Sequence, residues 1–275
     1  MTIVVGVAVP DGLILAADSR TTLLAGNRRA RIGSDNAQKV FLLAGRFGVA
    51  CYGAAFLEEK TISGAIREFE AGIRPGIQLE DLILELGAFF QKKALKSFRK
   101  LAGRTWRPAD DWQLGLLVAG FTQENVGHLF EIRVPGQKGR AQVIAPNVST
   151  TNIGLAPRGM VDVVDRLLAG FDPGALAASG VTPSKAMENA LAGLEYEPIL
   201  PITMQDAVDW AMLLIRTTID MQRLSDGTRA DAGGVPACGG PVRVLALEQN
   251  GHEWVSRPTL TATPPGNAEG SVVAC

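Results

Sequence analysis

Blocks of strand-like and helix-like patterning alternate along the chain, and their order restricts the fold more than any other feature. Short apolar runs rich in β-branched residues and bounded by glycine or proline turns predict strands. These runs lie at residues 3–9, 13–18, 39–45, 47–53, 114–121, 127–134, 141–145, 149–154, 240–248 and 252–256. Apolar residues at helical spacing predict helices at residues 56–72, 79–101, 157–170 and 204–224.

The order is therefore strands, two helices, strands, two helices and strands. Strands that are joined by tight turns pair in antiparallel fashion. Two antiparallel sheets with helices covering both outer faces would bury all of these apolar surfaces in one body. The sequence thus predicts an α+β fold.

A single domain spanning residues 1–257 accounts for this pattern. Residues 171–203 are rich in Pro, Ala and Gly and resemble an insertion, with a short helix expected at 183–193. Residues 258–275 show little periodicity, so we expect a disordered C-terminal tail.

Composition excludes several classes of function. The net charge is −1, and the densest basic stretch, residues 92–100, is typical of a solvated helix face rather than of a nucleic-acid patch. Only His128 and His252 are present, and neither has a second histidine at ligand spacing, so we expect no metal site. The chain has no G-x-x-x-x-G-K-[ST] loop and no G-x-S-x-G motif. We expect no cofactor.

The expected location is the cytoplasm. No apolar run is long enough to span a membrane, and the first residues lack the basic region of a signal peptide. The cysteines, Cys51, Cys238 and Cys275, are odd in number and far apart, as is typical of a reducing compartment.

The chemistry is expected at the start of the chain, where Thr2 precedes the first predicted strand. Removal of Met1 would leave a residue that carries both a hydroxyl and a free α-amine, whose ordinary pKa is near ~8. Nucleophile and base would then belong to one residue. The alternative is that Thr2 merely begins a strand.

Asp18 ends the second predicted strand and Lys39 begins the third. A lysine beside the nucleophile would favour the developing alkoxide, and a carboxylate would hold that lysine in place. A surface ion pair of little consequence is the alternative interpretation.

The stretch "TIVVGVAVPDGLILAADSRTT" resembles the start of mature proteasome β-subunits and their bacterial relatives, which are N-terminal nucleophile hydrolases. The resemblance continues in "NAQKVFLL" and "VACYGAAF" and, more weakly, to residue 256. It implies a four-layer αββα sandwich and a catalytic set of Thr2, Asp18, Lys39 and Gly53, with Gly53 supplying an oxyanion-hole amide. Thr22, Cys51 and Ala55 would bind the substrate.

Two features depart from this pattern. The serine that such proteins place after a glycine near the nucleophile aligns with Leu155, after Gly154. The loop after the last long helix is longer than in such proteins, and its acid does not align. Asp226, Asp231 or neither takes that place, and an ordinary turn or cap role is open for both.

The resemblance implies a threonine-type peptidase that hydrolyses peptides or unfolded proteins, is activated by removal of Met1 and works as a homo-oligomeric ring or stack. An ATPase partner is possible, whereas nucleic acid and membrane are not expected. Two alternatives stay open: a catalytically silent subunit of a proteasome-like assembly, and a small-molecule amidase of the same fold.

Overall fold

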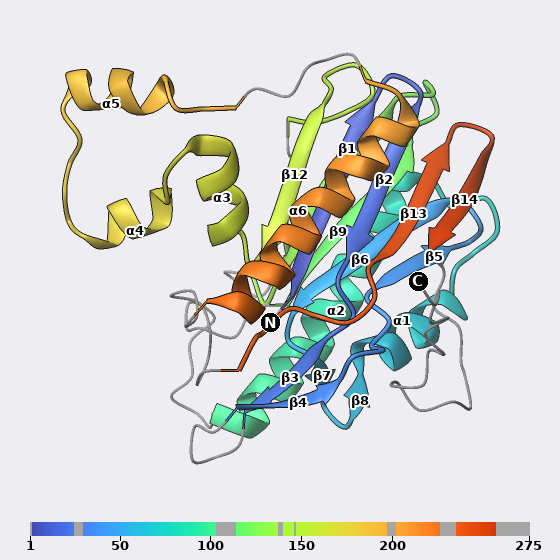
Figure 1. The fold of residues 1–275 in the computed structure, drawn as a ribbon. Helices are drawn as coiled ribbons and strands as arrows, with labels where there is room; N and C mark the ends of the chain where they lie inside the picture. Colours follow the sequence, from blue (N-terminus) through green and yellow to red (C-terminus); the bar gives the residue numbers. More distant parts are fainter. Residues whose placement is uncertain are drawn as a thin grey trace, which may run out of the picture.

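The computed structural model describes residues 2–24, 30–102, 114–136, 140–145, 147–196, 202–225 and 235–256. It has the predicted α+β class, with helices and several antiparallel sheets (Figure 1). The first sheet has the strand order β12-β1-β2-β13-β14. Its strands are β1 (Ile3–Val9), β2 (Gly12–Ala17), β12 (Gly154–Gly159), β13 (Arg243–Glu248) and β14 (Gly251–Ser256).

The second sheet has the order β11-β10-β9-β6-β5. Its strands are β5 (Val40–Leu43), β6 (Phe47–Gly53), β9 (Leu114–Phe121), β10 (Gly127–Val134) and β11 (Gln142–Ile144). Two small hairpins complete the strands: β3 (Thr21–Leu24) with β4 (Ala30–Ser34), and β7 (Phe56–Leu57) with β8 (Lys60–Thr61).

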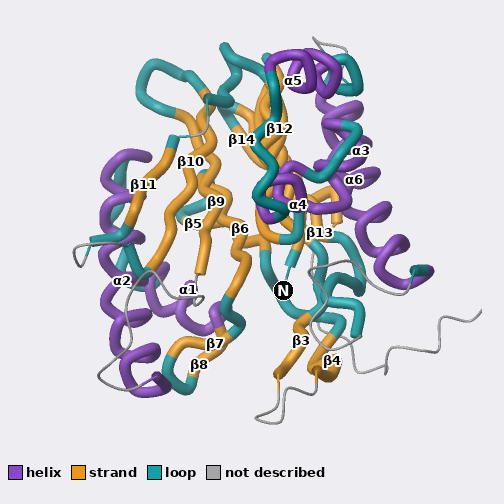
Figure 2. Tube along the Cα trace, turned by 90° about the vertical axis from the view of Figure 1, so that its left-hand side faces the viewer, coloured by secondary structure: helices purple, strands orange, loops and turns teal. Residues whose placement is uncertain are grey.

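Six helices lie in the described part of the chain (Figure 2). They are α1 (Ile62–Glu70), α2 (Leu79–Ala102), α3 (Asp162–Ala169), α4 (Pro173–Ala178), α5 (Lys185–Ala192) and α6 (Met204–Leu224). Thr203 and Asp206 form a capping box at the start of α6.

Three apolar clusters explain why these elements pack as they do. One joins α1 and α2 to the β6–β9–β10 sheet through residues such as Ile66, Leu82 and Leu116. A second joins α3 and α6 to the β1–β2 sheet. The third lies between the sheets, where Leu15 of β2 and Leu117 of β9 are both completely buried. Each sheet therefore packs one face against helices and the other face against the second sheet.

The helices α4 and α5 lie on the left of Figure 1, where α3 stands between α4 and the two sheets. Neither contains a buried residue among those the structure describes. They fall within residues 171–203, where one short helix was expected and α4 was missed. The expected tail at 258–275 lies outside the described residues.

Three local predictions were wrong. The helix expected at 56–72 begins only at Ile62, after Thr61 caps it, because residues 56–61 form the β7–β8 hairpin. The strand expected at 149–154 is a turn region, and the helix expected from 157 is preceded by β12. Pro157 is tolerated in β12 because that strand lies at a sheet edge and pairs only with β1.

Candidate active site

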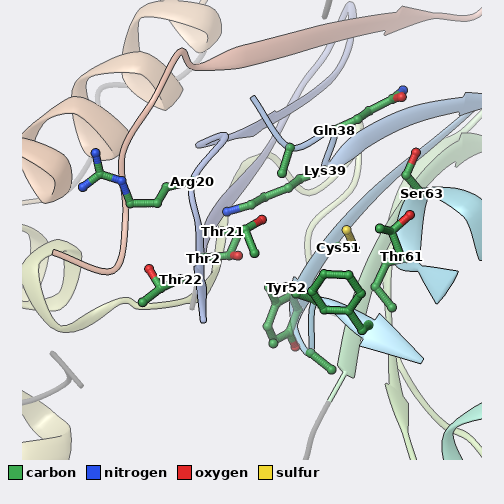
Figure 3. A pocket seen from close by; sticks show the side chains of 16 residues that line it. Thr2, Arg20, Thr21, Thr22, Gln38, Lys39, Cys51, Tyr52, Thr61 and Ser63 are labelled. Carbon is green, nitrogen blue, oxygen red and sulfur yellow. The ribbon is translucent and has the colours of Figure 1, made fainter. Parts of the chain in front are cut away.

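A pocket opens at the N-terminal end of β1, at the point where the two sheets and the small hairpins meet (Figure 3). Its volume is about 200 Å³. Six of the seven residues that the sequence analysis selected line it: Thr2, Thr22, Lys39, Cys51, Gly53 and Ala55. The seventh residue, Asp18, is buried and forms an ion pair with Lys39. The structure thus brings all seven together.

The charged pair of this site is buried. The Lys39 ammonium lies 2.8 Å from Oδ1 of Asp18, and their side chains are 7% and 0% exposed. Lys39 directly precedes β5 and Asp18 directly follows β2, so each comes from the end of a buried strand in a different sheet. The Lys39 side chain extends toward Thr2 in the pocket view (Figure 3). Lys39 and Thr2, which the sequence analysis selected as nucleophile, therefore line the same pocket.

Backbone amides complete the surroundings of Asp18. Its Oδ1 accepts a hydrogen bond from the Ile3 N–H (3.2 Å), and its Oδ2 accepts from the N–H groups of Arg20 (3.1 Å) and Gly239 (3.0 Å). Such bonds stabilise an ionised carboxylate. Because Ile3 follows Thr2 in the chain, the same carboxylate that holds Lys39 also holds the backbone next to Thr2.

Thr2 is 5% exposed, and its carbonyl oxygen accepts a hydrogen bond from the Met160 N–H (2.9 Å). The residue before Met160 is Gly159, with φ +85°. A Cβ at Gly159 would overlap the Thr2 carbonyl oxygen, so the backbone comes this close to Thr2 only because residue 159 is glycine.

This contact corrects the alignment of the missing serine. Leu155 pairs with Val7, well along β1 from Thr2, whereas Ile3 pairs with Gly159. The residue that follows a glycine next to Thr2 is therefore Met160, not Leu155. Its thioether is buried against Cys238, so a hydroxyl is absent from this position in either alignment.

Gly53, the expected oxyanion-hole residue, is the last residue of β6 and has φ +90°. Non-glycine residues rarely adopt this conformation, which allows the backbone to turn at the edge of the pocket. Cys51 and Ala55 line the same pocket two residues to either side.

The substrate-binding candidates differ in their surroundings. The Thr22 hydroxyl donates to the Ala237 carbonyl (3.3 Å), so it also fastens the loop that carries Gly239. Burial raises the pKa of the Cys51 thiol to about 12, although the charge of Lys39 acts in the opposite direction. Cys51 is therefore a neutral thiol in the pocket wall at neutral pH.

Sequence reasoning missed the clamp on the loop at residues 235–242. Arg20 makes a two-bond ion pair with Asp35 (2.6 and 3.0 Å) and also donates to the Pro236 carbonyl (3.3 Å). The Ser19 hydroxyl donates to the Pro241 carbonyl (2.6 Å). The motif at 18–22 contained this signal, because all five of its residues are polar and it has no apolar face to bury. Asp226 and Asp231 lie outside the described residues.

Sequence reasoning also missed Tyr52, which lines the pocket between Cys51 and Gly53, and its partner Glu131. No group of three or more His, Cys, Asp or Glu residues is placed to hold a metal ion among the residues described. In the same part of the chain, no helix has the length and apolar character needed to cross a bilayer.

Comparison with known proteins shows a likeness of fold. No protein-family model matches the sequence, and no curated protein matches it. A solved structure described as the helical assembly of the Anbu complex from Pseudomonas aeruginosa has a similar fold, with a TM-score of 0.54 and 17% sequence identity. The match covers 90% of this chain and 81% of that chain.

These findings overturn the assignment to the proteasome β-subunits and their relatives. At 17% identity, with no family model matched, the comparisons support a shared fold and nothing finer. The resemblance was strongest over residues 2–53 and weaker from there to residue 256.

Proposed function

We propose that this chain hydrolyses amide bonds, with Thr2 as the nucleophile. The observation that carries the proposal is the buried Asp18–Lys39 pair, which presents an ammonium group in the pocket that Thr2 lines. Buried charges are costly unless they are paired, so a paired lysine at a pocket that a hydroxyl also lines supports a functional interpretation of the pair.

The proposed reaction begins with cleavage of the peptide bond before Thr2. The exposed α-amine, with an ordinary pKa near ~8, takes the proton of the Thr2 hydroxyl. Oγ attacks the substrate carbonyl carbon, and the oxyanion accepts a hydrogen bond from the Gly53 N–H. The C–N bond then breaks as the ammonium returns its proton to the leaving amine. Water hydrolyses the resulting ester and regenerates Thr2.

The other pocket residues take supporting roles in this proposal. Lys39 stabilises the developing negative charge on Oγ, and Asp18 keeps Lys39 ionised and in place. Thr22 bonds the substrate backbone, while Cys51 and Ala55 contact its side chain. A pocket of about 200 Å³ suits the side chain of a peptide, so peptides or unfolded segments are the proposed substrates.

The architecture enters the proposal in two ways. The three apolar clusters support a four-layer αββα sandwich, formed as one domain with α4 and α5 as an insertion. The solved structure with a similar fold, the Anbu complex, is described as a helical assembly. We infer that this chain also assembles with copies of itself and acts in the cytoplasm.

The test combines intact mass, covalent labelling and turnover. Wild-type protein should lose the residue before Thr2, take up one peptide epoxyketone at Thr2 and hydrolyse fluorogenic peptide amides. Thr2→Ala should abolish labelling and turnover, and Thr2→Ser should retain part of both. Ser63→Ala removes a different hydroxyl from the same pocket wall and serves as the control.

An intact bond before Thr2, together with absent labelling and absent turnover, would contradict the proposal. Turnover of peptides that survives Thr2→Ala would assign the activity to another residue. Hydrolysis of small amides but not of peptides would restrict the substrate class and retain Thr2 as nucleophile.

A further inference from the structure

A buried carboxylate that the proposed reaction does not use lies behind the pocket wall. Glu131 of β10 has a side chain that is 1% exposed. Its Oε1 accepts hydrogen bonds from the Tyr52 hydroxyl and from Nε of Arg133 (2.7 Å). Its Oε2 accepts from Nη2 of Arg133 (3.2 Å) and Nε of Arg158 (2.8 Å). Both oxygens are therefore satisfied by directional donors.

These donors come from both sheets. Tyr52 and Arg133 flank Gly115 of β9 in one row across the second sheet. A Cβ at Gly115 would overlap the Tyr52 ring, so the bare glycine lets the phenol extend across β9 to Glu131. Arg158 belongs to β12 of the first sheet. The Glu131 network therefore links the two sheets at the end of the apolar core between them.

Each end of the network adjoins a backbone group that the proposed reaction requires. Tyr52 is followed directly by Gly53, whose N–H is the proposed oxyanion donor. Arg158 is followed by Gly159 and Met160, and the Met160 N–H holds the Thr2 carbonyl at 2.9 Å. The nucleophile and the oxyanion donor belong to different sheets, and Glu131 connects the segments that carry them.

The charges agree with this arrangement. Burial acts to raise the pKa of Glu131, but the hydrogen bonds from Arg133 and Tyr52 and the charge of Arg158 outweigh it, so that pKa lies below its usual value. Burial and the bond to Glu131 raise the pKa of Tyr52. At neutral pH the network is an ionised acceptor with protonated donors, the state in which such bonds are strongest.

We propose that Glu131 is a positioning residue that sets the separation between the Thr2 hydroxyl and the Gly53 N–H by tying Tyr52 to Arg158. This inference rests on the proposed function. Apolar packing between sheets is not directional, whereas charge-assisted bonds fix one arrangement. A displacement of the reacting groups by about 1 Å costs on the order of 10²-fold in rate, so the reaction is sensitive to the separation between the Thr2 hydroxyl and the Gly53 N–H.

The experiment uses the full chain with the bond before Thr2 cleaved, a fluorogenic peptide amide and a peptide epoxyketone. Tyr52→Phe removes one hydroxyl and keeps the ring on Gly115. It should lower kcat and the labelling rate of Thr2 by about 10- to 100-fold, with KM unchanged. Glu131→Gln should lower both further, and adding Tyr52→Phe to it should have little additional effect, because the two act through one network.

Ser97→Ala is the control. Ser97 lies in α2, away from the pocket, and is also buried. Its hydroxyl accepts a hydrogen bond from the Glu58 N–H (2.9 Å). It should leave kcat unchanged at a similar cost in stability. If Glu131→Gln fails to fold, the kcat and labelling rate of Tyr52→Phe alone test the positioning role.

A Tyr52→Phe protein that is folded and labels at the wild-type rate would overturn the inference and leave the proposed function standing. A wild-type protein that neither labels nor turns over would overturn the proposed function, and the positioning role with it. A fall in kcat that Ser97→Ala reproduces would show a general loss of rigidity and also contradict the inference.

Discussion

Oδ1 of Asp18 and the Lys39 ammonium lie 2.8 Å apart, and the carboxylate is completely buried. The two partners do not depend on each other equally. The Asp18 carboxylate accepts hydrogen bonds from three backbone N–H groups in addition to the bond from Lys39. In the described part of the chain, the Lys39 ammonium has a hydrogen bond to Asp18. Loss of the carboxylate therefore leaves a buried charge with less compensation than loss of the ammonium does.

We expect Asp18→Asn to lower the free energy of unfolding by about 3–5 kcal/mol, and Lys39→Met to lower it by less. Urea denaturation measures both. The Lys60–Glu68 pair has the same 2.8 Å separation with exposed side chains, so Lys60→Met should lower the free energy of unfolding by much less than either buried-site variant. A larger loss in Lys39→Met than in Asp18→Asn would contradict the asymmetry.

Gly159→Ala tests the backbone contact with Thr2. Alanine at φ +85° is strained, and its Cβ would overlap the Thr2 carbonyl oxygen. The matched control is Gly76→Ala, because Gly76 has φ +74° with nothing within 4 Å of an added Cβ. The control should cost about 1–2 kcal/mol from backbone strain alone.

Gly159→Ala should cost more than this in thermal unfolding and should also reduce epoxyketone labelling of Thr2. Equal losses of stability in the two variants, with unchanged labelling, would show that the contact with Thr2 is dispensable.

Cys51 should resist alkylation although it lines the pocket. Burial raises the pKa of its thiol to about 12, so the reactive thiolate is scarce at neutral pH. Iodoacetamide at pH 8 should leave Cys51 unmodified in the native protein and modify it in guanidinium, as followed by peptide mass spectrometry. Rapid modification of Cys51 in the native state would contradict the raised pKa.

Glu131 should contribute to the acid sensitivity of the fold. Its pKa in the folded protein lies below the ordinary value of 4.5, because the bonds from Arg133 and Tyr52 outweigh burial. Its contribution to stability is therefore complete above pH 4.5 and is lost as the pH falls through the lowered folded pKa.

Glu131→Gln should flatten the decline of unfolding free energy in this acidic range, as measured by urea denaturation at a series of pH values. Glu68 also has a lowered pKa but is exposed. The pH dependence of the unfolding free energy in Glu68→Gln is therefore compared with that in Glu131→Gln. Identical slopes in wild type and Glu131→Gln would exclude the contribution of Glu131.

Much of the local structure could be predicted from the sequence. The apolar spacing of residues 79–101 predicted α2 within one residue of its end, and the pattern at 204–224 matched α6. These signals are local, because hydrogen bonding within a helix and side-chain direction along a strand repeat over a few residues.

The family assignment and several junctions could not be predicted in this way. The glycine-based alignment selected Leu155 because it compared residue types, and the pairing of β1 with β12 places Met160 beside Thr2 instead. The helix expected from residue 56 failed because a short hairpin and the Thr61 cap delay its start.

The sequence by itself determined the α+β class and brought Thr2, Asp18 and Lys39 into one hypothesis. Only the tertiary structure decided that Asp18 gathers three backbone amides and that Glu131 joins Tyr52 to Arg158 across two sheets. The physical reason is range. Strand and helix patterns follow from neighbouring residues, whereas contacts between sheets depend on strand register and on packing that the whole chain sets together.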